Sequence, residues 1–370
     1  MANIAIVLHD LRGGGAEKMM VRLANQLADE GDVVNLILIT SGGINKRFLQ
    51  PNVNLIELNC KRTLSAFKPL RTALKKIRPE GILAALTHIN VITAIVCYSL
   101  GWSKKLSVSE RNAFSLDKNV NTNAVMKAAY FLAPFVYRAL PNPVIAVSKG
   151  VASDLVESTI TRDKDVTTAP NPVVIKETID AAKAPPSHKW LVNKSLPTII
   201  AVGRLTNQKG FDMLLDAFYQ VNKSLNCRLI IFGEGELREQ LESHARSLGI
   251  EDRVSLPGYT ANPLAEMKAA DLYVLSSRFE GSPNAIVEAM SVSTAVVAFD
   301  CPHGAREILQ DGKVAPLVEY MNVEKLSAAI VHELQTALSP DYSAEIKKFT
   351  AQAAAKSYRK LIIERKSRNQ

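Results

Sequence analysis

Residues 276–290 read Ser-Ser-Arg-Phe-Glu-Gly-Ser-Pro-Asn-Ala-Ile-Val-Glu-Ala-Met, and this stretch predicts more about the fold than any other. It places Glu280 just before a predicted helix and Glu288 about two turns inside that helix. The preceding run, Ala270–Ser276, has the pattern of a buried strand, so the Glu280 loop follows a strand's carboxyl end. In open α/β sheets ligands bind at this edge, and we therefore expect a ligand site here.

The start of the predicted helix suits an anion. Ser282 is a good N-cap, and Pro283 fits the first helical position because its missing N–H would have no partner there. The N–H groups of Asn284, Ala285 and Ile286 would then face an anion, which the helix dipole also favours. A nucleotide-sugar site needs such a helix tip for phosphate, with carboxylates beside it for sugar hydroxyls. The alternative is a capped surface helix with solvated glutamates, and the strand before the helix favours the site.

Length and composition describe a soluble globular protein with two domains. The chain has 370 residues, of which 47% are hydrophobic and 22% are charged. Its four cysteines lie far apart without metal or redox spacing, which favours reduced thiols in a cytoplasmic protein. Met1 leads directly into an apolar strand, without a signal-peptide pattern. The apolar segment Ile82–Leu100 contains His88 and Asn90, and a buried strand, loop and helix are favoured there over a transmembrane helix.

Apolar β-branched runs alternate with amphipathic helical patterns in both halves, which predicts an α/β fold with a doubly wound parallel sheet in each half. The predicted strands are Ile4–Leu8, Val33–Ile39, Leu55–Leu58, Ile82–Leu86, Leu106–Val108, Val144–Val147, Thr198–Val202, Arg228–Phe232, Val254–Leu256, Leu272–Leu275 and Ala295–Phe299. Predicted helices include Ala16–Glu30, Phe211–Leu225, Glu236–Leu248, Ala285–Ser291 and a basic tail at Tyr342–Glu364. The segment Val173–Pro197 contains two adjacent prolines and no clean period, so we expect the domain boundary there.

A loop with two cations follows the first strand of the second half. It reads Gly203-Arg204-Leu205-Thr206-Asn207-Gln208-Lys209-Gly210 and precedes a predicted helix. One planar bidentate cation and one flexible point charge suit a pyrophosphate leaving group. Two solvated loop cations are the alternative, and the glutamate helix in the same half favours the phosphate interpretation.

A glycine run, Gly13-Gly14-Gly15, follows the first strand of the chain and opens a helix. Glycines let backbone N–H groups approach a ligand closely. The run fails the dinucleotide pattern G-x-G-x-x-G because Lys18 stands at the third glycine position, which disfavours an NAD site. A phosphate loop and a tight strand-to-helix turn both remain open.

Polar residues also follow two other strands of the first half. His88 lies just after Ile82–Leu86, and Glu110-Arg111-Asn112 follows the next strand. A lone histidine among apolar residues is often structural, but this position at a strand's carboxyl end also suits a functional role. We therefore keep both interpretations of His88.

The net charge of +9 belongs mostly to the first half. Residues 1–172 hold 21 Lys and Arg against 13 Asp and Glu, whereas residues 173–370 hold 24 against 23. The helical pattern Ser65–Arg78 carries a basic arc beside an apolar stripe, and Asn123–Leu140 mixes aromatic and basic residues. This distribution favours docking on an anionic membrane surface, and no pattern indicates nucleic-acid binding.

The Glu280–Glu288 segment, the Gly203–Gly210 loop and the Gly13–Gly15 loop together resemble retaining glycosyltransferases of family 4, which have the GT-B fold. The similarity spans almost the whole chain. The segments around His88 and Glu110 resemble the bacterial branch that builds lipopolysaccharide, capsule or lipid-linked oligosaccharides.

The resemblance implies two Rossmann-like domains facing across a cleft: an acceptor domain at 1–172, a linker at 173–197, a nucleotide-sugar domain at 198–345 and a helix at 346–370 that returns to the first domain. It implies that Glu280 binds donor-sugar hydroxyls, Glu288 binds the ribose, and Arg204 and Lys209 hold the β-phosphate. His88 would lie near the reacting sugar. The remaining donor-side residues are Gly15, Gly203, Gly258, Tyr259, Ser282, Pro283, Asn284, Ala285 and Ile286, and the acceptor-side residues are Gly13, Gly14, Glu110 and Arg111.

We therefore expect retaining transfer of a hexose or N-acetylhexosamine from a UDP-sugar to a lipid-linked or lipopolysaccharide acceptor, at the inner face of the plasma membrane. Neither a metal nor another cofactor is expected, because Arg204, Lys209 and the helix tip would stabilise the charge on the leaving phosphate. A front-face departure of UDP is favoured over double displacement through Glu280. The alternatives are a GDP-mannose-dependent mannosyltransferase, a nucleotide-sugar 2-epimerase, an NAD-linked dehydrogenase and a membrane scaffold without activity.

Overall fold

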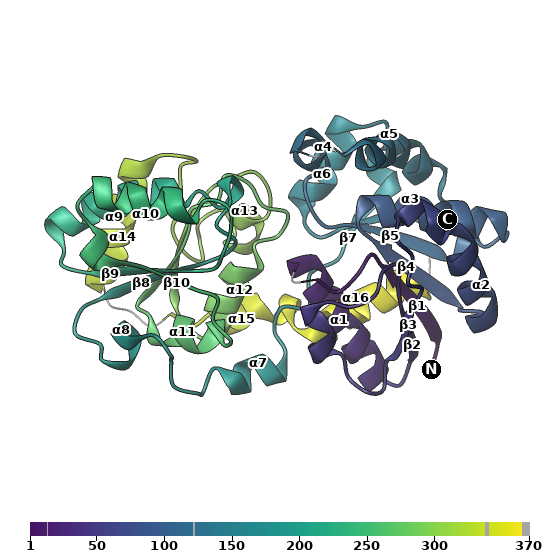
Figure 1. The fold of residues 1–370 in the computed structure, drawn as a ribbon, viewed down its shortest axis with the longest axis horizontal. Coiled ribbons are helices and arrows are strands. Elements are labelled where there is room, and N and C mark those ends of the chain that lie inside the picture. Colours follow the sequence, from purple (N-terminus) through teal and green to yellow (C-terminus); the bar gives the residue numbers. More distant parts are fainter. Residues whose placement is uncertain (13, 121–122, 337–339, 365–370) are drawn as a thin grey trace. The chain divides into compact units, whose positions relative to one another are not determined.

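The computed structural model describes residues 1–12, 14–120, 123–336 and 340–364, and the chain divides into two compact units (Figure 1). Unit 1 comprises Met1–Val173 and Lys348–Gln370, and unit 2 comprises Val174–Lys347. The residues after Val173 that were predicted as a linker group with unit 2, where they form two short helices.

Unit 1 is built on a seven-stranded, entirely parallel sheet in the order β3-β2-β1-β4-β5-β6-β7. Its strands are β1 (Asn3–Leu8), β2 (Val33–Leu38), β3 (Asn54–Glu57), β4 (Gly81–Ala85), β5 (Leu106–Glu110), β6 (Val144–Ala146) and β7 (Val166–Thr168). Its α-helices are α1 (Gly15–Asp29), α2 (Phe67–Ile77), α3 (Thr87–Ser99), α4 (Phe114–Val120), α5 (Ala124–Ala139), α6 (Lys149–Ser158) and α16 (Ala351–Ile362).

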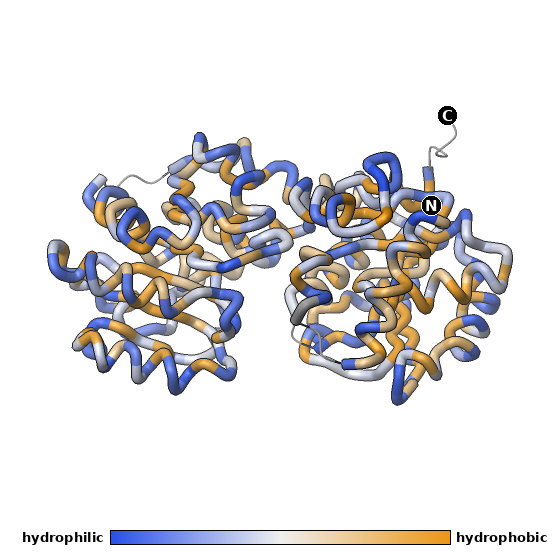
Figure 2. The backbone as a smooth tube through the Cα atoms, turned by 90° about the horizontal axis from the view of Figure 1, so that it is seen from above, coloured by the Kyte–Doolittle hydropathy of each residue, from blue (hydrophilic) through white to orange (hydrophobic). Residues whose placement is uncertain are grey.

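Both faces of the unit 1 sheet are covered, which explains why its strands are near-continuous apolar runs rather than alternating ones. One core cluster joins the sheet to α2, α3 and α5, and the other joins it to α1 and α16. In Figure 2 the hydrophobic positions accordingly run through the interior of each unit, and the hydrophilic ones lie on the outer turns.

The helix α16 is part of the core of unit 1. Its Tyr358 and Ile362 are fully buried, and a Cβ added at Gly81 would clash with the Ile362 side chain. Ser107 Oγ donates to the Leu361 carbonyl at 3.0 Å, and Arg359 Nε donates to Asp32 Oδ2 at 3.0 Å. The tail therefore completes the domain in which the chain began.

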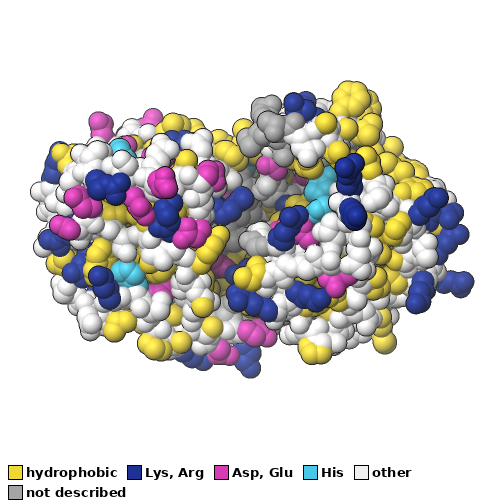
Figure 3. Space-filling view, viewed as in Figure 1, with side chains coloured by type: hydrophobic (Ala, Val, Ile, Leu, Met, Phe, Trp, Pro, Cys, Tyr) yellow, Lys and Arg dark blue, Asp and Glu magenta, His cyan; other side chains and the backbone are white. Residues whose placement is uncertain are grey.

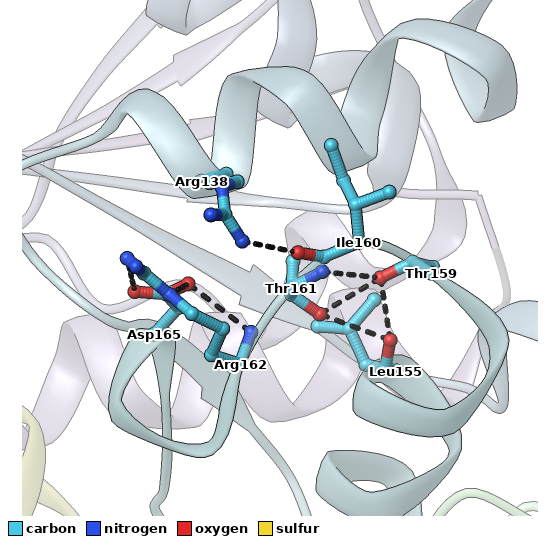
Figure 4. Close-up of polar contacts among 7 residues, drawn as sticks. All are labelled: Arg138, Leu155, Thr159, Ile160, Thr161, Arg162 and Asp165. Atoms are coloured by element: carbon cyan, nitrogen blue, oxygen red, sulfur yellow. Dashed lines mark hydrogen bonds and ion pairs between the residues drawn. The ribbon is translucent and has the colours of Figure 1, made fainter.

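The segment that leads from α6 to β7 is fixed by polar contacts (Figure 4). Arg138, near the end of α5, donates to the Ile160 carbonyl at 2.9 Å. Arg162 donates through Nε to the buried Asp165 carboxylate at 2.9 Å. These contacts hold the last part of unit 1 before the chain passes to unit 2.

Unit 2 has a six-stranded parallel sheet in the order β10-β9-β8-β11-β12-β13. Its strands are β8 (Thr198–Val202), β9 (Arg228–Phe232), β10 (Val254–Gly258), β11 (Leu272–Leu275), β12 (Ala295–Phe299) and β13 (Leu317–Val318). Its α-helices are α7 (Lys176–Ala181), α8 (Lys189–Val192), α9 (Phe211–Ser224), α10 (Arg238–Ser247), α11 (Pro263–Ala269), α12 (Asn284–Ser291), α13 (Ala305–Ile308), α14 (Val323–Thr336) and α15 (Ser343–Ile346). In Figure 1, α9, α10 and α14 lie on one side of this sheet, and α8 and α11 lie on the other.

The predicted fold of two doubly wound parallel sheets is confirmed, with three local corrections. The edge strands β7 and β13 were not predicted, because segments of three and two residues carry no readable period. Leu86 does not extend β4: it has a φ of 83° and is the N-cap of α3. The helix α12 begins at Asn284 with Pro283 as its N-cap residue, so Ser282 does not cap it.

Candidate active site

The two sequence-predicted loops of unit 2 lie at the same sheet edge. The strands β8 and β11 are hydrogen-bonded neighbours, with Ile199 opposite Leu272 and Ile200 opposite Tyr273. Because the strands are parallel, the segments that follow them, 203–210 and 276–283, emerge side by side at their carboxyl ends. The topology therefore brings together the two cations and the first glutamate.

An ion pair joins these loops. Lys209 Nζ lies 2.6 Å from Glu280 Oε1, and the hydroxyl of Ser277 donates to the same oxygen at 2.6 Å. The Glu280 side chain is only 7% exposed, and that of Lys209 is 20% exposed. Among the described residues, no hydrogen bond reaches Glu280 Oε2. One carboxylate oxygen is thus fixed by the protein, and the other has no partner within the part of the chain that the structure describes.

Further contacts hold the backbones of the two loops together. Ser276 Oγ donates to the Lys209 carbonyl at 2.9 Å, and the Arg278 N–H donates to the Gln208 carbonyl at 2.7 Å. Gly210 has a φ of 60°, and a Cβ there would clash with the Ser276 carbonyl. Arg278 also pairs with Asp212 at 2.6 Å. The position of the Lys209 loop is therefore set by the Glu280 loop.

Arg204 lies in the same loop but is exposed and, among the described residues, forms no ion pair. The neighbouring backbone is anchored to the loop after β9, because the Leu205 N–H donates to the Glu234 carbonyl at 2.9 Å. A Cβ at Gly203 would lie 3.3 Å from the Lys209 side chain, so glycine keeps that side chain unobstructed. The guanidinium is thus carried on an ordered loop and is open to an anion.

The helix α12 contributes the second glutamate. Ile286 N–H donates to the Pro283 carbonyl at 3.0 Å, so this predicted anion donor is already engaged within the first turn. Glu288 is partly buried on α12. Burial raises the pKa of the Tyr273 hydroxyl well above its ordinary value, and the charges of Glu280 and Glu288 raise it further. The negative charges of both carboxylates thus act on the same buried phenol.

Gly258 and Tyr259 were predicted beside the base. Gly258 ends β10, and Tyr259 follows it, at the same sheet edge as the ion pair. Gly258 has a φ of 89°, and its carbonyl accepts from the Gly233 N–H at 2.9 Å. The Tyr259 side chain is 76% exposed.

The structure adds a loop that the sequence interpretation missed. The Glu280 N–H donates to the Pro302 carbonyl at 3.1 Å, and a Cβ at Gly304 would lie 2.6 Å from Pro283 Cδ. Burial raises the pKa of the Cys301 thiol, and the neighbouring Glu280 raises it further. The signal that could have revealed this loop is its place directly after the strand β12.

In unit 1, His88 lies in the first turn of α3, after the carboxyl end of β4. Its ring meets that of His9 edge to face, with 5.1 Å between the ring centroids. Burial, together with the nearby His9, lowers the pKa of His88 to about 4. The Nδ1 atoms of both rings are buried and have no hydrogen-bond partner among the described residues. His9 was not predicted, although it directly follows β1, which is the neighbour of β4.

Glu110 ends β5 and is buried rather than open to a substrate. It accepts hydrogen bonds from Thr87 Oγ1 at 3.0 Å, from Asn90 Nδ2 at 3.3 Å and from the hydroxyl of Tyr137. Burial raises the pKa of Glu110 to about 7, although these hydrogen bonds lower it. Its carboxyl thus holds the first turn of α3, in which His88 lies.

Arg111 is likewise buried, and its guanidinium donates to the hydroxyl of Tyr358 at 2.7 Å and to Asn171. This geometry favours a structural role over the predicted contact with the acceptor. Gly14 and Gly15 form the start of α1, and a Cβ at Gly15 would meet no atom of the protein within 4 Å. Gly13 lies outside the described residues.

Comparisons with known proteins agree with this architecture. Residues 196–336 match the family model described as glycosyl transferases group 1. The chain is 27% identical to the N-acetylgalactosamine-N,N'-diacetylbacillosaminyl-diphospho-undecaprenol 4-alpha-N-acetylgalactosaminyltransferase of Campylobacter jejuni, over 99% of this chain and 98% of the relative.

Two solved structures share the whole fold. Anabaena HepE, in complex with UDP and glucose, superposes with a TM-score of 0.79 at 19% identity, over 99% of this chain and 100% of that one. The lipopolysaccharide outer core galactosyltransferase WaaB superposes with a TM-score of 0.71 at 18% identity, over 98% and 99% of the two chains. The fold is GT-B, and these similarities together support a GT-B glycosyltransferase. Within the described residues, no helix has the length and apolar character needed to cross a membrane.

Proposed function

We propose that the protein is a retaining glycosyltransferase of family 4 that moves a hexose or N-acetylhexosamine from a UDP-sugar to a hydroxyl of a lipid-linked or lipopolysaccharide glycan. The similarity to the Campylobacter undecaprenol-linked transferase and to WaaB supports this acceptor class. The similarity to HepE, solved with UDP, supports the donor class.

The observation that carries the proposal is the Lys209–Glu280 pair at the carboxyl ends of β8 and β11. The ammonium of Lys209 can bind a phosphate, and the carboxylate of Glu280 can bind sugar hydroxyls. In a nucleotide sugar these two groups are adjacent, because the β-phosphate is bonded directly to the sugar. Glu280 Oε2 is available to accept from a hydroxyl of the donor sugar. Arg204 lies on the same loop and is exposed, which suits a second contact with the β-phosphate. Glu288 is the proposed partner of the ribose.

In this mechanism the bond from the anomeric carbon to UDP breaks first, and negative charge accumulates on the β-phosphate. Lys209 and Arg204 stabilise that charge as it develops, which is the role that metal-independent catalysis requires of protein cations. The acceptor oxygen bonds to the anomeric carbon on the face that UDP leaves, and the departing phosphate oxygen takes the proton of the acceptor hydroxyl, so configuration is retained. We rank double displacement through Glu280 lower, because the hydrogen bonds from Lys209 and Ser277 to Oε1 draw electron density from the carboxylate and reduce its nucleophilicity.

Unit 1 is proposed to bind the acceptor. His88 is neutral at physiological pH because burial lowers its pKa to about 4, so it can hydrogen-bond a sugar hydroxyl without adding charge. The packing of the protein does not demand glycine at Gly15, where a side chain would meet open space. Close approach of a ligand to the backbone is a reason for glycine at this position, as expected for a loop that contacts the diphosphate and the acceptor.

The test is release of UDP and GDP by the purified protein across a panel of nucleotide sugars, with and without membrane extract as the source of acceptor. We expect UDP release that depends on the extract, and a product anomer that matches the donor. GDP release from GDP-mannose alone would establish the mannosyltransferase alternative, and epimerisation of the donor without acceptor would establish the 2-epimerase. An inverted product would contradict retention.

We also propose peripheral association with an anionic membrane, through α5 rather than through α2. The apolar stripe of α2 is used in the core, where Leu70 and Leu74 are fully buried. In contrast, α5 exposes Phe131 at 69% and Phe135 at 54%, and its charged residues are Lys127 and Arg138. Figure 3 shows hydrophobic side chains gathered over α5 and α3. An apolar surface whose helix carries only positive charges suits a bilayer with anionic headgroups.

Co-sedimentation with phosphatidylglycerol vesicles tests this surface. Binding should fall as salt rises, and the double variant Phe131→Ser/Phe135→Ser should lose about 2–3 kcal/mol of binding free energy, because two half-exposed aromatic rings no longer enter the bilayer. Leu64→Ser is the matched control, since Leu64 is 70% exposed beside α2. Loss of binding in the control alone would assign the contact to α2.

A further inference from the structure

The carboxylate of Glu280 is held asymmetrically. Its Oε1 receives two short hydrogen bonds, one from Lys209 and one from Ser277, both at 2.6 Å. Lys209 would move toward a phosphate in the proposed reaction, so its contact with Glu280 changes when donor binds. The hydroxyl of Ser277 has no role in binding phosphate, so its hydrogen bond to Glu280 stays in place when donor binds.

Ser277 is well placed to act as a constraint. It is 1% exposed and lies two residues beyond the end of β11, in the central part of the sheet. Its neighbour Ser276 donates to the Lys209 carbonyl at 2.9 Å, so two adjacent hydroxyls hold the two charged residues from one short segment. A buried side chain at the end of a central strand has few accessible rotamers. A carboxylate that is hydrogen-bonded to it is therefore restricted in orientation as well.

We propose that Ser277 is a positioning residue for the donor sugar: it fixes Glu280 Oε1 so that Oε2 is presented to the sugar hydroxyls in one orientation. This inference rests on the proposed function. Without Ser277 the carboxylate can rotate about its last bond and offer either oxygen. The pocket should then bind the sugar less tightly and distinguish less well between donors that differ in the direction of one hydroxyl.

The experiment compares Ser277→Ala with the wild type in two binding titrations and one kinetic assay. Calorimetry with UDP alone reports on the nucleotide contacts, whereas calorimetry with the intact UDP-sugar adds the sugar contacts. We expect the affinity for UDP to stay within about twofold and that for the UDP-sugar to fall about 10- to 100-fold, the usual effect of losing a hydrogen bond to a charged group. The ratio of kcat/KM values for UDP-glucose and UDP-galactose should move toward one.

Two further variants separate positioning from packing. Ser277→Thr keeps the hydroxyl and should retain most of the donor preference, which a role in packing alone would not predict. Ser224→Ala is the matched control, because this serine also bonds within unit 2, to the Val221 carbonyl at 3.1 Å on α9. It should leave all three measurements unchanged.

The outcomes are distinct. Equal losses of affinity for UDP and for the UDP-sugar would mean that Ser277 supports the pocket as a whole, and would overturn the inference. Unchanged UDP-sugar affinity and unchanged donor preference would overturn it as well. If the wild type releases no nucleotide from any donor, the proposed function itself fails, and this is seen before any variant is made.

Discussion

Arg204→Ala provides the sharpest test of the phosphate site, because stability and catalysis separate at this position. The guanidinium is exposed and, among the described residues, forms no ion pair, so its removal should change the free energy of unfolding by less than about 0.5 kcal/mol. If it stabilises charge on the β-phosphate, turnover should fall roughly 10²–10³-fold, about 2.7–4 kcal/mol in the barrier. Removal of an exposed loop cation with no ligand would leave both turnover and the free energy of unfolding almost unchanged.

The assay is UDP release at saturating donor, together with a denaturant titration of each variant. Arg246→Ala is the matched control, because Arg246 is also an exposed arginine of unit 2, near the end of α10. Arg204→Lys should recover part of the rate, since it restores the charge but not the planar fork. Near-normal kcat for Arg204→Ala would refute the reasoning, as would a rate loss explained by a large drop in unfolding free energy.

Three other substitutions address the remaining groups. Lys209→Met should lower turnover by roughly 10²-fold or more. It should also lower the free energy of unfolding by about 1–3 kcal/mol, because the buried Glu280 loses its cationic partner; an unchanged thermal midpoint would contradict the ion pair. Glu288→Ala should weaken UDP binding about tenfold or more with the fold intact, and unchanged affinity by calorimetry would refute its contact with the ribose. Glu110 has a raised pKa in the folded state, so its contribution to stability is full below about pH 4.5 and is lost as pH rises through about 7. Glu110→Gln should remove this pH dependence from the free energy of unfolding, and an unaltered pH profile would contradict the effect of burial on this carboxyl.

The two sheets, and the loops that form the candidate site of unit 2, could be predicted from the sequence. Strands buried on both faces are long apolar runs, and loops at their carboxyl ends follow from parallel order alone. This is why the neighbourhood of Lys209 and Glu280 could be expected before their 2.6 Å contact was seen. The start of α12 was misplaced by one residue, because local capping preferences do not fix a helix end when a neighbouring loop packs against it.

The unit 1 residues were harder to interpret, because their environment depends on distant segments. The partners of Glu110 include Tyr137, 27 residues away, and those of Arg111 include Tyr358, 247 residues away. No local pattern reveals that a charged pair at a strand end is enclosed by two helices. His9 was missed for a related reason: it becomes notable only when β1 and β4 are neighbours and its ring meets His88.

The place of α16 in unit 1 has a consequence for how the protein matures during translation. While the ribosome is still adding residues 351–362, the first sheet lacks Ala355, Tyr358 and Ile362, and the guanidinium of Arg111 lacks its tyrosine partner. Unit 2, which is one uninterrupted stretch of chain, can finish folding earlier. The amino-terminal domain is therefore completed last, and a nascent or shortened chain without this helix exposes an unfinished surface to chaperones and proteases.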